Sequence, residues 1–93
     1  MSRAFVNEDA ANEPEPRYSL PEAGSPYYAE AAAWALIEGA NRGDTRGAEL
    51  ATGYHWGDPA LVDHIRAIAI QAAEREETRI AQLARRYLRA ARG

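Results

Sequence analysis

Apolar residues recur at helical spacing through the C-terminal half of the chain. After Asp58 and Pro59, a typical helix start, they form a first stripe of Leu61, Val62, Ile65, Ile68, Ala69 and Ala72 and a second stripe of Ile80, Leu83, Ala84, Tyr87 and Leu88. Spacings of three and four place such side chains on one face of an α-helix. Ile70 lies off the first stripe and is expected to widen it.

Six polar residues, 74–79, separate the two stripes. Helix propensity favours continuity, because Glu and Arg are good helix formers and no Gly, Pro, Asn or Asp interrupts. Size favours a break. One helix from Pro59 to Ala91 would be roughly 50 Å long, whereas a compact body of about seventy residues has a diameter of roughly 28 Å. We therefore predict a break near residues 76–78 and a helical hairpin in a monomer, with one long helix as the alternative in a dimer.

A further helix is predicted at Ser25, which can cap free amides, with Pro26 at the first helical position. Its apolar residues, within 27–38, spread around most of the circumference. A helix with so little polar face is expected to be buried on several sides.

The next residues predict a turn and a short helix. Two glycines and Asn41 within residues 39–43 are expected to end the preceding helix. Asp44 can cap a helix that runs to about Thr52, with Gly53 ending it in a left-handed conformation. Together these elements predict an all-α bundle of three to four helices, residues 25–93.

Residues 1–24 are polar and rich in proline and glutamate. They bury too few apolar side chains to offset the entropy of ordering, so a flexible acidic arm is expected. The alternative is an extended segment that lies on the helical body. Two apolar pairs are available for such docking: Phe5 with Val6, and Tyr18 with Leu20.

Charge differs between the two ends of this chain, whose net charge is −3. The arm is mainly acidic, whereas a ridge of arginines at near-helical spacing follows the second apolar stripe: Arg85, Arg86, Arg89 and Arg92. This ridge has three interpretations: a solvated helix end that opposes the helix dipole, a contact for an acidic protein surface, or a phosphate contact. The negative net charge and the scarcity of base-reading side chains argue against nucleic acid.

An aromatic segment, Tyr54, His55 and Trp56, lies between Gly53 and Gly57. Large aromatic side chains of this kind can line a ligand pocket or form a binding hot spot. The favoured interpretation is structural: Trp56 and Trp34 fill the same small core and Tyr54 covers an edge.

The residues predict no catalytic, cofactor-binding or metal site. Cysteine is absent, and His55 and His64 are nine residues apart, whereas helical zinc ligands lie three or four apart. The serines lie in or beside the arm, where no base is held in line with them. We therefore do not expect an enzyme.

The hydropathy pattern predicts a soluble cytoplasmic protein with no membrane partner. No apolar stretch approaches the roughly twenty residues that a membrane span requires. Residues 1–10 also lack the hydrophobic core of a signal peptide.

The N-terminal part resembles a known family. The opening Met-Ser-Arg-Ala-Phe-Val-Asn-Glu-Asp, the Glu/Pro-rich stretch, and Ser25-Pro26-Tyr27-Tyr28 leading into Ala35-Leu36-Ile37-Glu38 are similar to the first forty or so residues of bacterial Gre-type transcript cleavage factors. Those proteins insert an acid-tipped helical hairpin into the secondary channel of RNA polymerase and carry a C-terminal β domain. No match continues after Arg42, and no β domain follows. The resemblance implies a bacterial, transcription-linked protein without the cleavage chemistry.

These observations predict a small, non-enzymatic protein-interaction module whose partner is a protein, RNA polymerase being the one that the resemblance implies. The candidate contact residues are Phe5, Val6, Tyr54, His55, Trp56, Arg85, Arg86, Arg89 and Arg92. Two alternatives remain open: a homo-oligomer assembled through the C-terminal helices, and phosphate or nucleic-acid contact through the arginine ridge.

Overall fold

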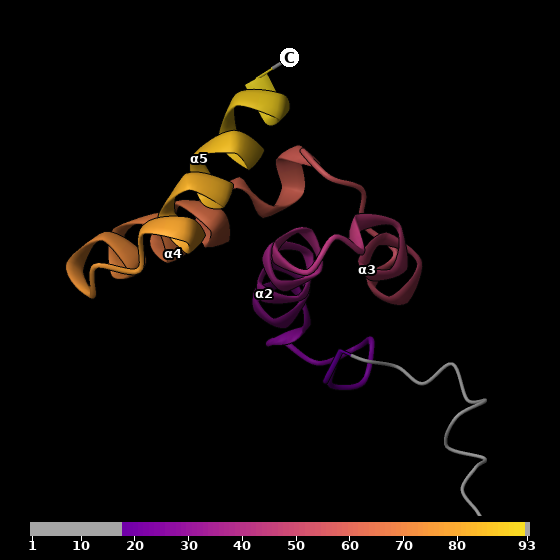
Figure 1. Ribbon diagram of the computed structural model, residues 1–93. Coiled ribbons are helices and arrows are strands. Elements are labelled where there is room, and N and C mark those ends of the chain that lie inside the picture. Colours follow the sequence, from indigo (N-terminus) through magenta and orange to yellow (C-terminus); the bar gives the residue numbers. More distant parts are fainter. Residues whose placement is uncertain (1–17, 93) are drawn as a thin grey trace, which may run out of the picture.

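The computed structural model describes residues 18–92 (Figure 1). In chain order, its elements are α2 (Tyr28–Asn41), α3 (Thr45–Thr52), the 3₁₀ helix η1 (Pro59–Leu61), α4 (Val62–Glu74) and α5 (Thr78–Arg92). The described residues contain no strand, so the all-α prediction is confirmed. Phe5 and Val6 lie outside the described residues, and their role stays a prediction.

The helical hairpin is present, and a specific turn makes it. The Glu77 N–H donates to the Ala72 carbonyl over 2.8 Å and the Glu76 N–H to the Ala73 carbonyl over 3.2 Å. Glu76 has a φ of 59°. This is a Schellman motif, in which a left-handed residue after the helix satisfies its last carbonyls. The chain therefore forms two antiparallel helices in place of one long helix.

The apolar stripes of the hairpin pack within the chain. The buried core combines residues of α2, η1, α4 and α5, and its largest fully buried side chains are Leu36, Ile37, Leu61, Ile65, Leu83 and Tyr87. The expectation that Ile70 widens the first stripe is wrong, because this side chain is 58% exposed. Ile70 follows Ile68 by two residues, which is about 200° around an α-helix.

The helix α2 is buried on several sides, as predicted; its buried residues are Ala32, Ala33, Ala35, Leu36, Ile37 and Gly39. It begins later than expected, with Tyr27 at the N-cap. The reason is local. The Ser25 hydroxyl accepts from the Tyr27 N–H over 3.0 Å and so completes a turn before the helix.

The short helix α3 matches its prediction at both ends. Asp44 accepts from the Gly47 N–H over 3.2 Å, and Gly53 ends the helix with a φ of 82°. The absence of a side chain at Gly39 lets α2 and α3 approach closely, because a Cβ there would lie 2.6 Å from the Ala48 Cβ.

Tyr18 lies against the two helices α2 and α3. Its ring is buried, and its hydroxyl donates to the Asp44 Oδ2 over 2.9 Å. The Arg42 guanidinium lies 5.1 Å from the centre of the ring. Tyr18 therefore docks on the helical body, the second of the two interpretations for its segment.

Within residues 18–92, no helix combines the length and the apolar composition that crossing a bilayer requires.

Candidate functional site

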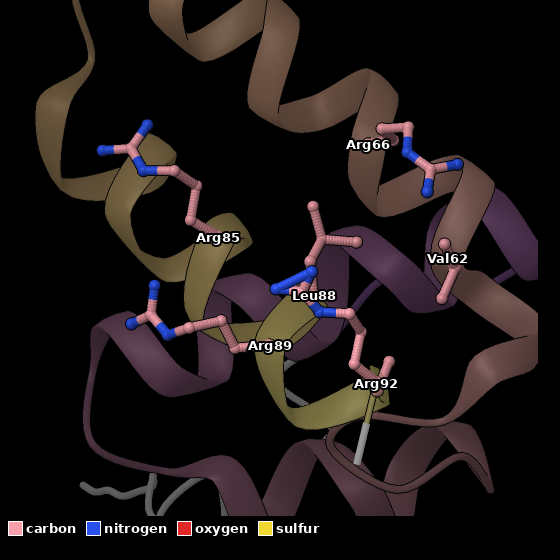
Figure 2. Close-up of a pocket in the computed structure, with 7 residues that line it drawn as sticks. Val62, Arg66, Arg85, Leu88, Arg89 and Arg92 are labelled. Atoms are coloured by element: carbon pink, nitrogen blue, oxygen red, sulfur yellow. The ribbon is translucent and has the colours of Figure 1, made fainter.

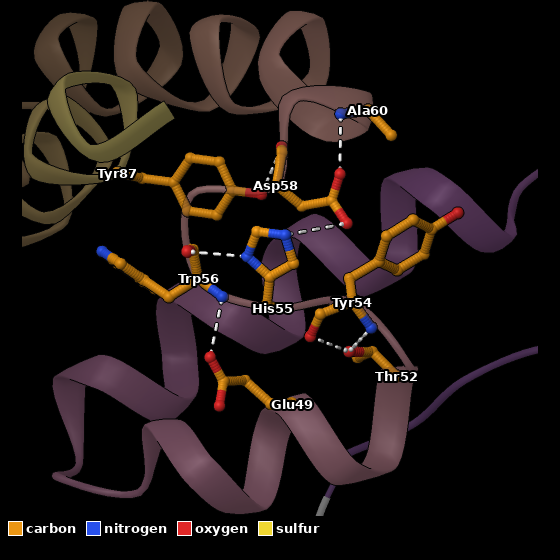
Figure 3. Close-up of polar contacts among 8 residues, drawn as sticks. All are labelled: Glu49, Thr52, Tyr54, His55, Trp56, Asp58, Ala60 and Tyr87. Atoms are coloured by element: carbon orange, nitrogen blue, oxygen red, sulfur yellow. Dashed lines mark hydrogen bonds and ion pairs between the residues drawn. The ribbon is translucent and has the colours of Figure 1, made fainter. Parts of the chain in front are cut away.

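The aromatic segment joins the α2–α3 pair to the α4–α5 hairpin (Figure 3). The Tyr54 N–H donates to the Thr52 Oγ1 over 3.1 Å. Tyr28 contacts both residues, since its hydroxyl donates to the Thr52 carbonyl over 2.9 Å and its ring centroid is 6.5 Å from that of Tyr54. Tyr54 is half-buried in this contact and covers an edge of the α2–α3 pair.

Trp56 links this segment to α5. The backbone N–H of Trp56 donates to the Glu49 Oε2 over 2.8 Å. The Trp56 ring meets the Tyr87 ring edge to face, with centroids 5.0 Å apart. Both Trp56 and Trp34 are half-buried and pack against the same core. The edge-to-face contact of Trp56 with Tyr87 stabilises the fold beyond what the burial of apolar area provides.

Tyr87 is the buried residue of α5 against which Trp56 packs. Its side chain is fully buried, and its hydroxyl donates to the Asp58 carbonyl over 2.8 Å. Burial, and then the negative charge of Asp58, raise the pKa of Tyr87 to about 12. The phenol is therefore kept in its neutral, hydrogen-bonding form.

His55 lies on the outside of the segment, with a side chain that is 67% exposed. Its Nδ1 is 3.1 Å from the Trp56 carbonyl oxygen and its Nε2 is 3.6 Å from the Asp58 Oδ2. The other Asp58 oxygen accepts from the Ala60 N–H over 2.9 Å and caps η1 (Figure 3). Asp58 thus starts the predicted helix, although the first turn is 3₁₀.

Gly57 brings this segment against the end of α5. Its φ is 89°, and a Cβ there would lie 3.0 Å from the Ala90 Cβ. We name residues 54–58 the aromatic joint, because their rings and hydrogen bonds connect the two helix pairs.

A second region, at the open end of the hairpin, is a hollow of about 400 Å³ (Figure 2). We name it the arginine groove. It is lined from α4 by Val62 and Arg66, and from α5 by Arg85, Leu88, Arg89, Ala91 and Arg92. The predicted ridge residues Arg85, Arg89 and Arg92 follow each other at spacings of four and three, so they share one face of α5.

A smaller hollow of about 350 Å³ adjoins the arginine groove through Arg85 and Arg89 and is also lined by Gln82 and Arg86. The structure therefore brings all four predicted ridge residues onto one surface.

Among the described residues, most of the positive charge of this surface has no ion-pair partner. In the described part of the chain, the two ion pairs are His55 with Asp58 and Arg66 with Asp63, the latter at 3.2 Å. The four ridge arginines are all exposed and take part in neither pair.

The sequence interpretation missed the α4 side of the groove, Val62 and Arg66. A signal for it was present in the predicted hairpin. Arg66 lies ten residues before Glu76, and the groove residue Arg85 lies nine residues after it. Positions about equally far from the turn of an antiparallel hairpin lie near one another.

The described residues include no group of three or more His, Cys, Asp or Glu placed to hold a metal ion. Comparison of the chain with protein-family models, curated proteins and solved structures finds no match. The resemblance to Gre-type factors therefore stays a prediction.

Proposed function

We propose that this protein is a non-enzymatic interaction module that binds an acidic segment of a partner protein in the arginine groove. The observation that carries the proposal is the set of exposed guanidinium groups of Arg85, Arg89 and Arg92 around an apolar floor; none of these three forms an ion pair within residues 18–92. Each guanidinium can donate two parallel hydrogen bonds to a carboxylate.

The strength of this charge favours a ligand over a merely solvated helix end. A helix C-terminus carries the equivalent of about half a negative charge. The arginines Arg85, Arg89 and Arg92 at the end of α5 exceed that several-fold. The surface therefore stays positively charged even after these arginines have balanced the negative end of the helix dipole.

The apolar floor favours a peptide over a free anion. Exposed ion pairs contribute only about 0.2–1 kcal/mol each, so charge alone gives weak binding. Val62, Leu88 and Ala91 offer an apolar surface for a side chain next to the acidic groups. The lining residues within 18–92 include no carboxylate or imidazole for proton transfer, which fits binding better than catalysis.

The proposal is tested by fluorescence anisotropy with a short, labelled peptide of alternating Glu and Leu. We expect saturable binding that weakens at least about tenfold at high salt, because salt screens exposed charges. The variant R85E/R89E is expected to lose binding. R46E/R75E, with the same charge change at exposed positions outside the groove, should lose much less. Equal loss in both variants would contradict a groove-specific site.

The same experiment separates the alternatives. Tighter binding of a short DNA duplex than of the peptide would favour the phosphate interpretation. A mass of at least twice 10.2 kDa by light scattering would favour the homo-oligomer.

For the partner, the N-terminal resemblance supports RNA polymerase in the bacterial cytoplasm. Co-purification at low salt that R85E/R89E abolishes would support this choice. If the unmodified protein is not retained by the polymerase at low salt, the transcription-linked part of the proposal is wrong and the groove needs another acidic partner.

A further inference from the structure

The arginine groove follows α5, and its arginines recur about once per helical turn. Arg85, Arg89 and Arg92 line it at spacings of four and three residues. At a rise of 1.5 Å per residue, Arg89 and Arg92 lie about 6.0 Å and 10.5 Å along the helix axis from Arg85. A ligand whose carboxylates meet all three arginines needs nearly the same spacing.

We propose that the occupant of the groove is an amphipathic α-helix of the partner, with carboxylates at spacings of three and four beside an apolar stripe. This inference rests on the proposed function, because it names the conformation of the acidic segment that the groove binds. Recognition of this kind, in which one helix lies in a groove between others, reads side chains that recur once per turn.

An α-helix reproduces the spacing of the three arginines. Its residues i, i+4 and i+7 share one face, and the second and third lie about 6.0 Å and 10.5 Å from the first. An extended segment has side chains on one side at every second residue, about 6.6 Å apart. Its third carboxylate would therefore lie about 3 Å beyond the level of Arg92, so it matches only two of the three arginines.

The apolar floor lies at the angle that such a helix requires. Leu88 precedes Arg89 by one residue, which is about 100° around α5, and it is half-buried in the groove. Val62 of α4 is also half-buried and lies on the other side of the hollow (Figure 2). An occupant helix can set its apolar stripe on Val62 and Leu88 while a neighbouring acidic stripe meets the arginines.

The groove lies beside the face of the hairpin that is buried in the core. Val62 and Arg66 follow the fully buried Leu61 and Ile65 by one residue each, about 100° around α4. Because Arg66 is exposed on this side, an added helix can lie along the hairpin without displacing α2.

The test compares two labelled peptides of the same composition of Glu, Leu and Ala for binding to the full chain by fluorescence anisotropy. Both have about fourteen residues, near the length from which an Ala-rich helix persists in water. In the first peptide, Glu and Leu each recur at spacings of three and four and form adjacent stripes on a helix. In the second, Glu and Leu alternate, so the acids share one side only in an extended segment. We expect the first peptide to bind at least about tenfold more tightly, because only its helix meets the arginines and the apolar floor together.

A third peptide tests the helix itself. Proline in place of the central alanine of the first peptide keeps every Glu and Leu but breaks the helix, so binding should weaken at least about tenfold. The matched control has proline at the first position, which a helix tolerates, and should bind nearly as well as the parent peptide.

Equal or tighter binding of the alternating peptide, or no loss from the central proline, would overturn the helical occupant. The proposed function stands in that case, provided that R85E/R89E still loses binding of the alternating peptide. If R85E/R89E and R46E/R75E bind the peptides equally well, or if no peptide binds the unmodified chain, the proposed function fails and this inference fails with it.

Discussion

The aromatic joint and the arginine groove both lie at the open end of the hairpin, and both hold residues that the sequence marks as contact candidates. They differ in where their polar groups are used. In the joint, Trp56, Tyr87 and Asp58 hydrogen-bond within the chain. In the groove, Arg85 and Arg89 are exposed and outside the ion pairs of the described residues.

On physical grounds, this difference separates the structural role of the joint from the binding role proposed for the groove. A polar group with internal partners stabilises the fold, and an external ligand would have to replace those partners. An exposed charge with no partner contributes little to stability and loses little when a ligand binds. Substitutions in the joint should therefore change the stability of the fold, whereas substitutions in the groove should change the binding of a ligand.

The largest effect is expected at Trp56. Trp56→Ala removes the ring contact with Tyr87 and leaves a cavity, at a cost of about 2–4 kcal/mol. That is a large fraction of the roughly 5–10 kcal/mol that stabilises a domain of this size. Urea denaturation followed by circular dichroism measures it. The control Tyr27→Ala, at a residue that is 69% exposed, should change stability by less than about 0.5 kcal/mol. Similar losses of stability in both variants would contradict the structural role assigned to the joint.

Gly57→Ala should have the next largest effect. The positive φ and the 3.0 Å approach to the Ala90 Cβ leave no room for a side chain, so a loss of about 1–3 kcal/mol is expected. Gly24→Ala is the matched control, because nothing lies within 4 Å of its added Cβ. If Gly57→Ala is as stable as this control by urea denaturation, the joint does not pack on α5 as described.

The raised pKa of Tyr87 predicts that the stability of the fold depends on pH through the joint. Its pKa is 10.0 when unperturbed and about 12 in the folded protein. The folded state therefore holds its proton more tightly, and the resulting stability is complete below pH 10 and is lost as pH rises toward 12. Tyr87→Phe removes this dependence and costs about 1 kcal/mol at neutral pH through the lost hydrogen bond.

Urea midpoints over an alkaline pH series measure this effect, with the exposed Tyr27→Phe as the control. If wild type and Tyr87→Phe lose stability in parallel above pH 10, burial of the phenol is not what couples the joint to pH.

The smallest effect concerns the turn that sets how α5 pairs with α4 along the groove. Glu76→Gly relieves a left-handed φ and should stabilise the protein by up to about 0.5–1 kcal/mol. In a continuous helix, the same change would destabilise by about 1 kcal/mol. Ala73→Gly, within α4, is the control for that loss. The sign of the change in urea midpoint decides between the two geometries.

Helices and caps were predictable because their causes are local. The Asp44 carboxylate caps the start of α3, and Gly53 ends this helix in a left-handed conformation because it lacks a Cβ. The two apolar stripes define the faces that become buried. The turn at Glu76 was predictable only from the size of a compact body. Its left-handed residue is a glutamate, so propensity gives no signal. The burial of Tyr18 depends on contacts with α2 and α3 that no local pattern records.

The candidate site was predictable in part. The ridge on α5 follows from helical spacing, but Arg66 joins it only through the pairing of α4 with α5. The structural role of Trp56 was the favoured interpretation, whereas its ring partner, Tyr87, was not foreseen because the two are far apart in sequence.

The most direct test is to follow side-chain N–H signals by NMR while the Glu–Leu peptide is added. If the groove is the contact surface, the Nε–H signals of Arg85, Arg89 and Arg92 shift with the peptide concentration, and the indole N–H of Trp56 stays in place. A shift of the Trp56 signal while the arginine signals stay unchanged would contradict the account, because it would place binding at the aromatic joint.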